Sequence, residues 1–150
     1  GKRAGDASGT GENALAHKHV LVAEDNALNA EVITAILNIH DATCEVAANG
    51  KEAVAKFGMS APGTFDMIFM DVQMPVMNGH DTARAIRAMD RPDAGTIPII
   101  AMTANAFDED RRNALASGMN GFLSKPIIVG DLVQELRKIL SDVRSPFPPS

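Results

Sequence analysis

Short apolar runs and helix-like apolar repeats alternate along the chain. Three nearly continuous apolar runs lie at residues 20–23, 67–70 and 97–102. Runs of this length, bounded by polar residues, are typical of strands that are buried on both faces. Shorter segments at 44–47 and 121–123 predict two further strands. We therefore expect five strands.

Residues with helical spacing fill the intervals between these strands. Leu28, Val32, Ile36 and Ile39 predict an amphipathic helix from residue 27 to about 40. Further helices are expected at 51–57, at 80–89, at 107–116, and from a cap at Asp131 to about 143. The expected inner faces are Ala53, Val54 and Phe57 in the second helix and Ala83, Ile86 and Met89 in the third.

The alternation of strand and helix decides the fold class. Five strand–helix units in succession predict an α/β protein with a parallel sheet covered by helices on both faces. Five parallel strands and five helices fit the doubly wound, flavodoxin-like arrangement with strand order 2-1-3-4-5. Crossovers between parallel strands should be right-handed.

The two ends of the chain lack this pattern. Residues 1–18 are rich in glycine and alanine without apolar periodicity, so we expect a flexible linker there. Residues 144–150 contain three prolines and are expected to form a disordered tail. One domain is therefore expected at 19–143. The first residue is Gly1 and not methionine, which predicts a processed product or a piece of a longer protein.

Composition narrows the classes of partner. The chain has 150 residues and a net charge of -5, which argues against nucleic-acid binding. Its apolar runs are far shorter than the ~20 residues of a membrane span, so no membrane contact is expected for this segment. The single Cys44 excludes an internal disulfide and fits a reducing, cytoplasmic location.

Polar side chains gather where the predicted strands end. Glu24 and Asp25 follow the first strand and Asp71 follows the third. Thr103 ends the fourth strand and Lys125 follows the fifth. Carboxyl ends of neighbouring parallel strands share one edge of the sheet, where such folds bind ligands. Any one of these residues alone could be a cap, a turn residue or a surface lysine; their joint position favours a single site.

The chemistry of this set indicates metal-assisted phosphoryl transfer. Three carboxylates repel one another unless a divalent cation lies between them. Oxygen ligands without nearby cysteine or histidine point to Mg²⁺, with Mn²⁺ as the alternative. Lys125 would add positive charge and Thr103 a hydrogen bond to an anionic oxygen. Asp71 lies in the middle of the group and is the expected nucleophile, giving an aspartyl phosphate.

Four motifs resemble one protein family, the receiver domain of two-component response regulators. They read Val-Leu-Val-Ala-Glu-Asp-Asn (20–26), Met-Asp-Val-Gln-Met-Pro-Val-Met-Asn-Gly (70–79), Ile-Pro-Ile-Ile-Ala-Met-Thr-Ala (97–104) and Ser-Lys-Pro (124–126). Together they span roughly residues 19–143 in the family's order and spacing. Any one of them would be a weak signal.

The resemblance implies a role for each acidic residue. Asp71 would be the phosphoacceptor, and Glu24 and Asp25 would hold Mg²⁺ together with it. The backbone carbonyl of Gln73 would complete the metal shell. The domain itself would catalyse at most its own phosphorylation and dephosphorylation.

Further roles follow from the same resemblance. Thr103 and Lys125 would bind phosphoryl oxygens, and the Lys125–Pro126 bond matches the family's cis peptide. Ala104 matches the small residue that leaves the acceptor open to its donor.

The resemblance also implies a conformational switch. Phosphorylation would draw Thr103 toward the new oxygens, and Phe122 would fill the space left behind. Gln73 and Asn105 occupy positions at which the family varies residues that tune the lifetime of the phosphate.

The residues of these motifs are most similar to those of receiver domains in hybrid sensor histidine kinases. Glu-Asp-Asn-Ala-Leu-Asn (24–29) and Met-Thr-Ala-Asn-Ala-Phe (102–107) carry this likeness. It implies a phosphohistidine domain of a histidine kinase as donor and a histidine phosphotransfer protein as the next partner in a phosphorelay. Kinase activity would then belong to a longer parent protein, which can be anchored in a membrane.

Three alternatives remain open at this point. The domain could be a stand-alone response regulator or a degenerate receiver that only binds partners, although no acceptor or metal acid is lost. It could also be a Mg²⁺-dependent phosphohydrolase. Such enzymes carry a second acid two residues after the nucleophile, where this chain has Gln73.

Overall fold

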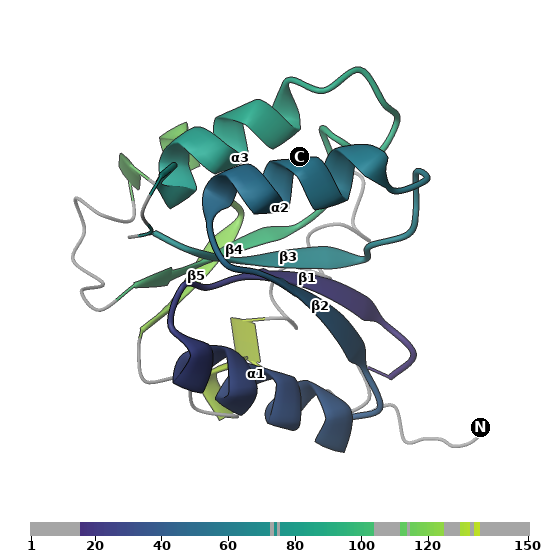
Figure 1. Cartoon of the computed structure of the whole chain (residues 1–150), viewed down its shortest axis with the longest axis vertical. Coiled ribbons are helices and arrows are strands. Elements are labelled where there is room, and N and C mark those ends of the chain that lie inside the picture. The colour runs from purple at the N-terminus through teal and green to yellow at the C-terminus, as the bar shows by residue number, and fades with distance from the viewer. Residues whose placement is uncertain are drawn as a thin grey trace, which may run out of the picture.

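The computed structural model describes residues 16–72, 74, 76–103, 112–113, 115–124, 130–132 and 134–135. Within these ranges the strands form one parallel sheet in the order β2-β1-β3-β4-β5 (Figure 1), so the predicted fold class and strand order are confirmed. The strands are β1 (His19–Ala23), β2 (Thr43–Ala47), β3 (Met67–Asp71), β4 (Ile99–Thr103) and β5 (Gly121–Ser124).

The fourth strand starts later than its apolar run. Ile97 and Pro98 precede β4, which begins at Ile99. Proline has no backbone N–H to donate to a neighbouring strand. The carbonyl of Pro98 nevertheless accepts a hydrogen bond of 2.9 Å from the backbone of Ile68 in β3.

Three helices have bounds within the described residues: α1 (Ala27–Ile39), α2 (Gly50–Met59) and α3 (Gly79–Arg87). Each follows an asparagine cap, namely Asn26, Asn49 or Asn78, whose side-chain oxygen accepts from the backbone N–H three residues later. None of the helices in the described ranges is long and apolar enough to cross a membrane.

The predicted fourth and fifth helices lie only partly inside the described ranges. Residues 112–113 and 115–116 are helical, as are 130–132 and 134–135. Asp131, which we expected to cap the last helix, is itself helical.

The helices cover the sheet in two layers. α1 lies on one face, and α2 and α3 lie on the other (Figure 1). Alternate residues of each strand point to opposite faces, so one strand serves both layers. In β3, Met67 and Phe69 pack in the cluster that includes α1, whereas Ile68 and Met70 pack in the cluster that includes α2 and α3. The inner faces expected for the second and third helices are confirmed, with Val54 and Met89 at the margin of that cluster.

The buried face of α1 differs from the expected one. The helix itself is confirmed, but its buried residues are Ala30, Ile33, Ile36 and Leu37. Among the four residues whose spacing predicted the helix, only Ile36 is buried; Leu28, Val32 and Ile39 are exposed. Two apolar stripes run along α1, and both satisfy the helical period. Packing of Ile33, Ile36 and Leu37 against the sheet buries one stripe and leaves the other exposed.

Candidate metal centre

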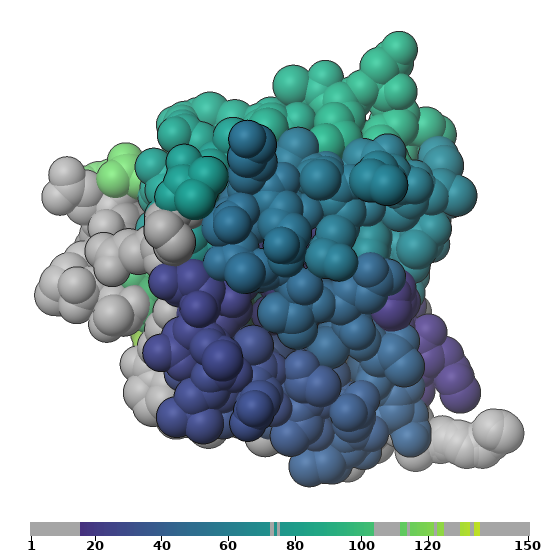
Figure 2. Space-filling view, in the orientation of Figure 1, coloured from purple at the N-terminus to yellow at the C-terminus, as the bar shows by residue number. Residues whose placement is uncertain are grey.

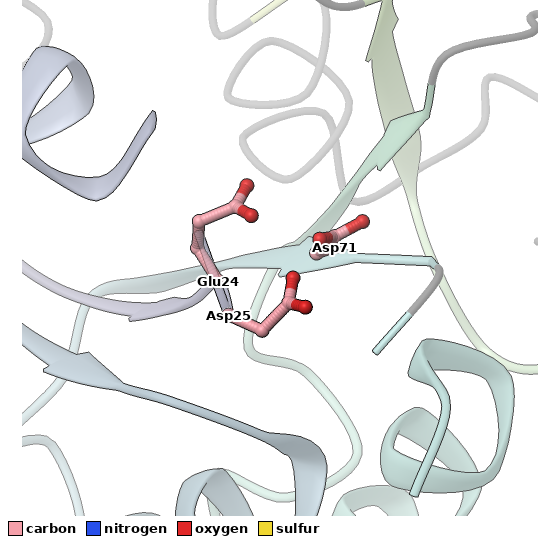
Figure 3. Close-up of side chains that lie close together, drawn as sticks. All are labelled: Glu24, Asp25 and Asp71. Atoms are coloured by element: carbon pink, nitrogen blue, oxygen red, sulfur yellow. The ribbon is translucent and has the colours of Figure 1, made fainter. Parts of the chain in front are cut away.

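Three carboxylates meet at one edge of the sheet. Glu24, Asp25 and Asp71 each offer an oxygen atom, and these atoms all lie within 4.8 Å of one another (Figure 3). Glu24 and Asp71 are each only 2% exposed, whereas Asp25 is exposed. The cluster is thus open to solvent through Asp25. The structure thus brings together the three acidic residues that we expected, from the sequence, to share one site.

The sheet register places these acids. Asp71 is the last residue of β3, the central strand, and lies opposite Met102 of β4. Glu24 directly follows β1, and its backbone N–H donates to the carbonyl of Ala47 at 2.9 Å, next to the last pair of β1 with β2, Ala23 with Ala47. Neighbouring parallel strands therefore deliver both side chains to the same edge.

The turn after β1 holds Glu24 and Asp25 in place. Glu24 Oε2 accepts a hydrogen bond of 3.1 Å from the backbone N–H of Asn26. Asn26 in turn caps α1, because its Oδ1 accepts from the backbone N–H of Asn29 at 3.0 Å. The start of α1 and the acidic turn are therefore one hydrogen-bonded unit.

The donor set fits a hard divalent cation. Three like charges within 4.8 Å, two of them buried, repel strongly where water screens them poorly. A cation between them removes that repulsion, and carboxylate oxygens are the ligands that Mg²⁺ prefers. The arrangement can hold Mg²⁺ while Asp71 stays at the sheet edge.

The backbone of Asp71 is in close contact with the first residue of α3. The Gly79 N–H donates to the carbonyl of Val72 at 3.0 Å. A Cβ atom on Gly79 would stand 2.5 Å from the carbonyl oxygen of Asp71. Between these residues, Val76 is exposed and adopts a left-handed backbone with φ of 71°. The sequence analysis did not predict this contact; a glycine directly after Asn78 at the end of the 70–79 motif was its only signal.

The other predicted site residues are placed less completely. Thr103 is the last residue of β4, half-buried, on the strand next to Asp71. Phe122 is in β5 and pairs with Ala101 of β4. Gln73, Ala104, Asn105, Lys125 and Pro126 lie outside the described residues.

Two arginines outside the acidic cluster donate hydrogen bonds to the loops around α3. Arg87 Nε donates to the carbonyl of Gly118 at 2.9 Å, Nη1 to the carbonyl of Ala94 at 3.0 Å, and Nη2 to Asn120 Oδ1 at 2.7 Å. Burial lowers the pKa of the Arg87 guanidinium. This side chain ties α3 to the segments that precede β4 and β5.

The second arginine is Arg91. It lies over the Phe57 ring, with its guanidinium carbon 4.1 Å from the ring centroid, and its Nε donates to Asp93 at 2.7 Å. The hydrogen bonds from Arg91 hold the pKa of the Asp93 carboxyl below its usual range. The pair links the end of α2 to the loop before β4.

Comparison with known proteins identifies this arrangement. Residues 20–137 match the family model of the response regulator receiver domain. The osmosensing histidine protein kinase SLN1 of Saccharomyces cerevisiae is 46% identical over 112 residues, which cover 72% of this chain and 9% of that protein. The chain spans 6 to 14% of the length of the curated relatives it matches, most of which are hybrid or probable histidine kinases.

Solved structures agree with the sequence comparison. The receiver domain of sensor histidine kinase PA1611 from Pseudomonas aeruginosa, with magnesium coordinated in its active-site cleft, is 36% identical with a TM-score of 0.73, covering 84% of this chain and 99% of that one. A co-crystal of the S. cerevisiae histidine phosphotransfer protein Ypd1 and the receiver domain of Ssk1 gives 30% identity and a TM-score of 0.71, covering 82% and 88%.

Proposed function

We propose, because this chain belongs to the response regulator receiver domain family, that Asp71 accepts a phosphoryl group from a phosphohistidine donor in a phosphorelay. The observation that carries this proposal is the convergence of Glu24, Asp25 and Asp71 at the end of the central strand. A buried carboxylate beside a divalent cation is suited to nucleophilic attack on phosphorus.

The transfer is a simple displacement. A carboxylate oxygen of Asp71 forms a bond to phosphorus while the bond from phosphorus to the donor's histidine nitrogen breaks. The histidine nitrogen keeps the bonding electron pair. Reversal of the same step returns the phosphoryl group to a histidine.

The acidic residues would hold the metal. Glu24, Asp25 and Asp71 would bind Mg²⁺, and the backbone carbonyl of Gln73 would be a further ligand; Mn²⁺ suits the same oxygen donors. When bound, the cation offsets negative charge on the phosphoryl oxygens. The donor set supports this assignment, and so does the magnesium in the PA1611 receiver domain.

Thr103 and Phe122 on the next two strands, and Lys125 beyond them in the sequence, would bind the phosphoryl group and respond to it. We assign binding of the phosphoryl oxygens to Thr103 and Lys125. We assign the conformational switch to Thr103 and Phe122. Gln73 and Asn105 would set the lifetime of the aspartyl phosphate. The position of Thr103 at the end of β4, on the strand beside Asp71, supports its part in this scheme.

Sequence identity to hybrid histidine kinases supports a proposal about the parent protein. We infer that the chain is the receiver region, about residues 19–143, of a hybrid sensor histidine kinase that works in the cytoplasm. Its donor would be the phosphohistidine domain of a kinase. Its acceptor would be a histidine phosphotransfer protein, the class to which Ypd1 in the Ssk1 co-crystal belongs.

Intact mass after incubation with acetyl phosphate tests the proposal. We expect one added phosphoryl group in the unmodified chain with Mg²⁺, and none without Mg²⁺ or in Asp71→Asn. Asp90→Asn is the matched control, because Asp90 is exposed and lies outside the acidic cluster, and it should label normally. Labelling of Asp71→Asn, or labelling that ignores the metal, would refute the assignment. Release of inorganic phosphate is measured alongside, to detect an adduct that hydrolyses quickly.

A further inference from the structure

The first residue of α2 is in close contact with the segment that follows Asp71. Gly50 is buried, and a Cβ atom there would stand 2.5 Å from the carbonyl oxygen of Met77 and 3.1 Å from its Cβ atom. The same added atom would overlap Oγ1 of Thr82 in α3. Met77 lies between Asp71, where β3 ends, and Gly79, where α3 begins. Only a residue without a side chain lets α2 approach this closely.

This contact lies at the edge of the sheet that carries the acids. α2 and α3 are neighbours on one face of the sheet, and their segments adjoin on the upper part of the space-filled surface (Figure 2). Each helix begins shortly after a strand ends, α2 after β2 and α3 after β3. Because parallel strands end at one edge, the starts of both helices lie near the acidic cluster and not at the far edge of the sheet.

The two groups that Gly50 meets are held in place by α3. Thr82 is fully buried, and its hydroxyl donates to the carbonyl of Asn78 at 2.7 Å. Asn78 directly follows Met77, and its Oδ1 accepts from the backbone N–H of Asp81 at 2.9 Å. The Met77 carbonyl and the Thr82 hydroxyl therefore move only together with the first turn of α3.

The start of α2 is also fixed. Asn49 Oδ1 accepts from the Glu52 backbone N–H at 2.8 Å, and Glu52 Oε1 accepts from the backbone N–H of Ala48 at 2.8 Å. Such reciprocal capping satisfies two backbone donors at the start of a helix. Ala53 and Phe57, on the inner face of the helix, are fully buried in the core. α2 therefore cannot withdraw from α3 without breaking these contacts.

The segment between β3 and α3 is the side of this contact that yields more easily. Val76 in that segment is 76% exposed and has a left-handed backbone with φ of 71°. A β-branched residue is strained in that conformation. Its exposed side chain adds little packing that would hold the segment in place. A side chain at position 50 should therefore displace residues 76–79 and not α2.

A displacement of these residues reaches the acidic cluster. Gly79, two residues after Met77, donates its backbone N–H to the carbonyl of Val72 at 3.0 Å and packs against the carbonyl oxygen of Asp71. The path from position 50 to Asp71 thus runs through backbone atoms of adjacent residues, and closely packed interiors transmit strain. The oxygen atoms of the three acids lie within 4.8 Å of one another, so a small shift of Asp71 changes the distances on which a bound cation depends.

We propose that Gly50 is a positioning residue for the phosphoacceptor. The close approach of α2 holds residues 77–79 in place, and these residues hold Asp71 within the acidic cluster. This inference rests on the function proposed above. Gly50 has no side chain that could bind the metal or the phosphoryl group, so it acts through its neighbours. A substitution at this position should therefore weaken Mg²⁺ binding in addition to its effect on stability.

A cycle of substitutions separates positioning from packing. A methyl group added at position 50 meets two obstacles, of which the Thr82 hydroxyl can be removed by substitution and the Met77 carbonyl cannot. Gly50→Ala is therefore made both in the unmodified chain and in Thr82→Ala. Gly58→Ala is the matched control in α2, because the nearest atoms to its added Cβ are side-chain atoms of Met89, at 3.6 and 3.8 Å.

Three measurements are made on each variant. Urea unfolding gives the stability, calorimetry gives the dissociation constant of Mg²⁺, and intact mass follows labelling by acetyl phosphate. We expect Gly50→Ala to weaken Mg²⁺ binding by about tenfold in both backgrounds and to slow labelling at limiting Mg²⁺ to the same degree. Its cost in stability should be smaller in Thr82→Ala, where one obstacle is gone. Gly58→Ala should change Mg²⁺ binding by less than about twofold.

Hydrogen exchange in the unmodified chain tests the same coupling without a substitution. Coupling between two sites is reciprocal, so bound Mg²⁺ should slow amide exchange in the first turn of α2 more than in its last turn. This measurement decides the matter if Gly50→Ala does not fold.

The outcomes separate this inference from the proposed function. Unchanged Mg²⁺ binding in Gly50→Ala would overturn the inference, and so would an equal loss of binding in Gly58→Ala. Full recovery of Mg²⁺ binding in the double variant would show that Gly50 serves only the packing of α2 on α3. Equal slowing of exchange in both turns of α2 would also contradict the coupling. An unmodified chain that binds Mg²⁺ but is never labelled would refute the proposed function instead, and the Mg²⁺ affinities would still decide the role of Gly50.

Discussion

Gly79 packs against the backbone of Asp71 so closely that a Cβ atom at position 79 would stand 2.5 Å from the Asp71 carbonyl oxygen. The same Cβ would lie 2.9 Å from the Cα atom of Val72. The obstacles are backbone atoms, which cannot rotate away as a flexible side chain can. The start of α3 therefore sets the position of the end of β3.

Gly79→Ala should disturb the acceptor and not only the helix. We expect a loss of about 1–3 kcal/mol in the free energy of unfolding, because strand end or helix must shift. We also expect weaker Mg²⁺ binding, since Asp71 moves with its backbone. Urea unfolding and a magnesium titration measure the two effects. Gly95→Ala is the control, because nothing lies within 4 Å of its added methyl group and its backbone is not left-handed; an equal effect of both substitutions would disprove the close-contact explanation.

Magnesium should stabilise the fold through the acidic cluster. At a concentration ten times its dissociation constant, a ligand that binds only the folded state adds about 1.4 kcal/mol to the free energy of unfolding. Asp25→Asn should lose most of this gain. In the absence of metal the same variant should be more stable than the unmodified chain, because one of three repelling charges within 4.8 Å is gone.

Thermal unfolding with EDTA and with MgCl₂ measures this crossover. Asp90→Asn, an exposed substitution outside the cluster, should keep the full response to magnesium. Identical metal responses in Asp25→Asn and Asp90→Asn would remove Asp25 from the metal site.

Asp93 should make the fold sensitive to acid. Arg91 lowers the pKa of Asp93 in the folded state, so the folded protein holds the proton less tightly than the unfolded chain, whose Asp has a pKa of about 3.9. The stabilisation is complete above that value and is lost as the pH falls through the lower pKa of the folded state. Asp93→Asn should therefore cost stability at pH 6, and this cost should shrink as the pH falls below about 3.9, the ordinary pKa of Asp.

Urea unfolding of Asp93→Asn and of the unmodified chain across this pH range checks the direction of the effect. Asp81→Asn is the comparison, because its ion pair with Arg84 has side chains 58–59% exposed and should contribute little. A gap between Asp93→Asn and the unmodified chain that stays constant with pH would show that the ionised form of Asp93 is not what stabilises the loop.

Arg87 should be irreplaceable by lysine. Its guanidinium donates to three acceptors in different directions, the carbonyls of Gly118 and Ala94 and the side chain of Asn120. A lysine ammonium ends in one atom and cannot span them. We expect Arg87→Lys to cost about 2–3 kcal/mol in urea unfolding, close to the cost of Arg87→Ala. Arg84→Lys, at an exposed position of the same helix, should cost less than about 0.5 kcal/mol.

The buried strands β1, β3 and β4 and the acid cluster were predictable from the same property, a parallel sheet covered on both faces. A strand buried on both faces is apolar at every position, so β3 is recognisable without knowing which face points where. Parallel strands must end at one edge, so the residues after them meet whatever the details of packing. Glu24, Asp25 and Asp71 could therefore be placed together from the sequence alone.

The orientation of α1 was not predictable in the same way. Its sequence carries two apolar stripes, and the helical period does not say which one is buried. Leu28, Val32 and Ile39 satisfy the period as well as Ile33 and Leu37 do. Which stripe is buried is decided by packing against the strands, where Ile33 and Leu37 lie. The contact of Gly79 with Asp71 was hidden likewise, because it joins elements whose distance only the folded chain defines.

The two-layered arrangement also governs how many proteins the domain accommodates at one time. α1 covers one face of the sheet and α2 and α3 cover the other, so the outer surfaces of these helices point in opposite directions (Figure 1). A protein seated along α1 leaves the outer surfaces of α2 and α3 accessible. A contact made on α1 and a contact made on α2 or α3 therefore use different surfaces of the domain.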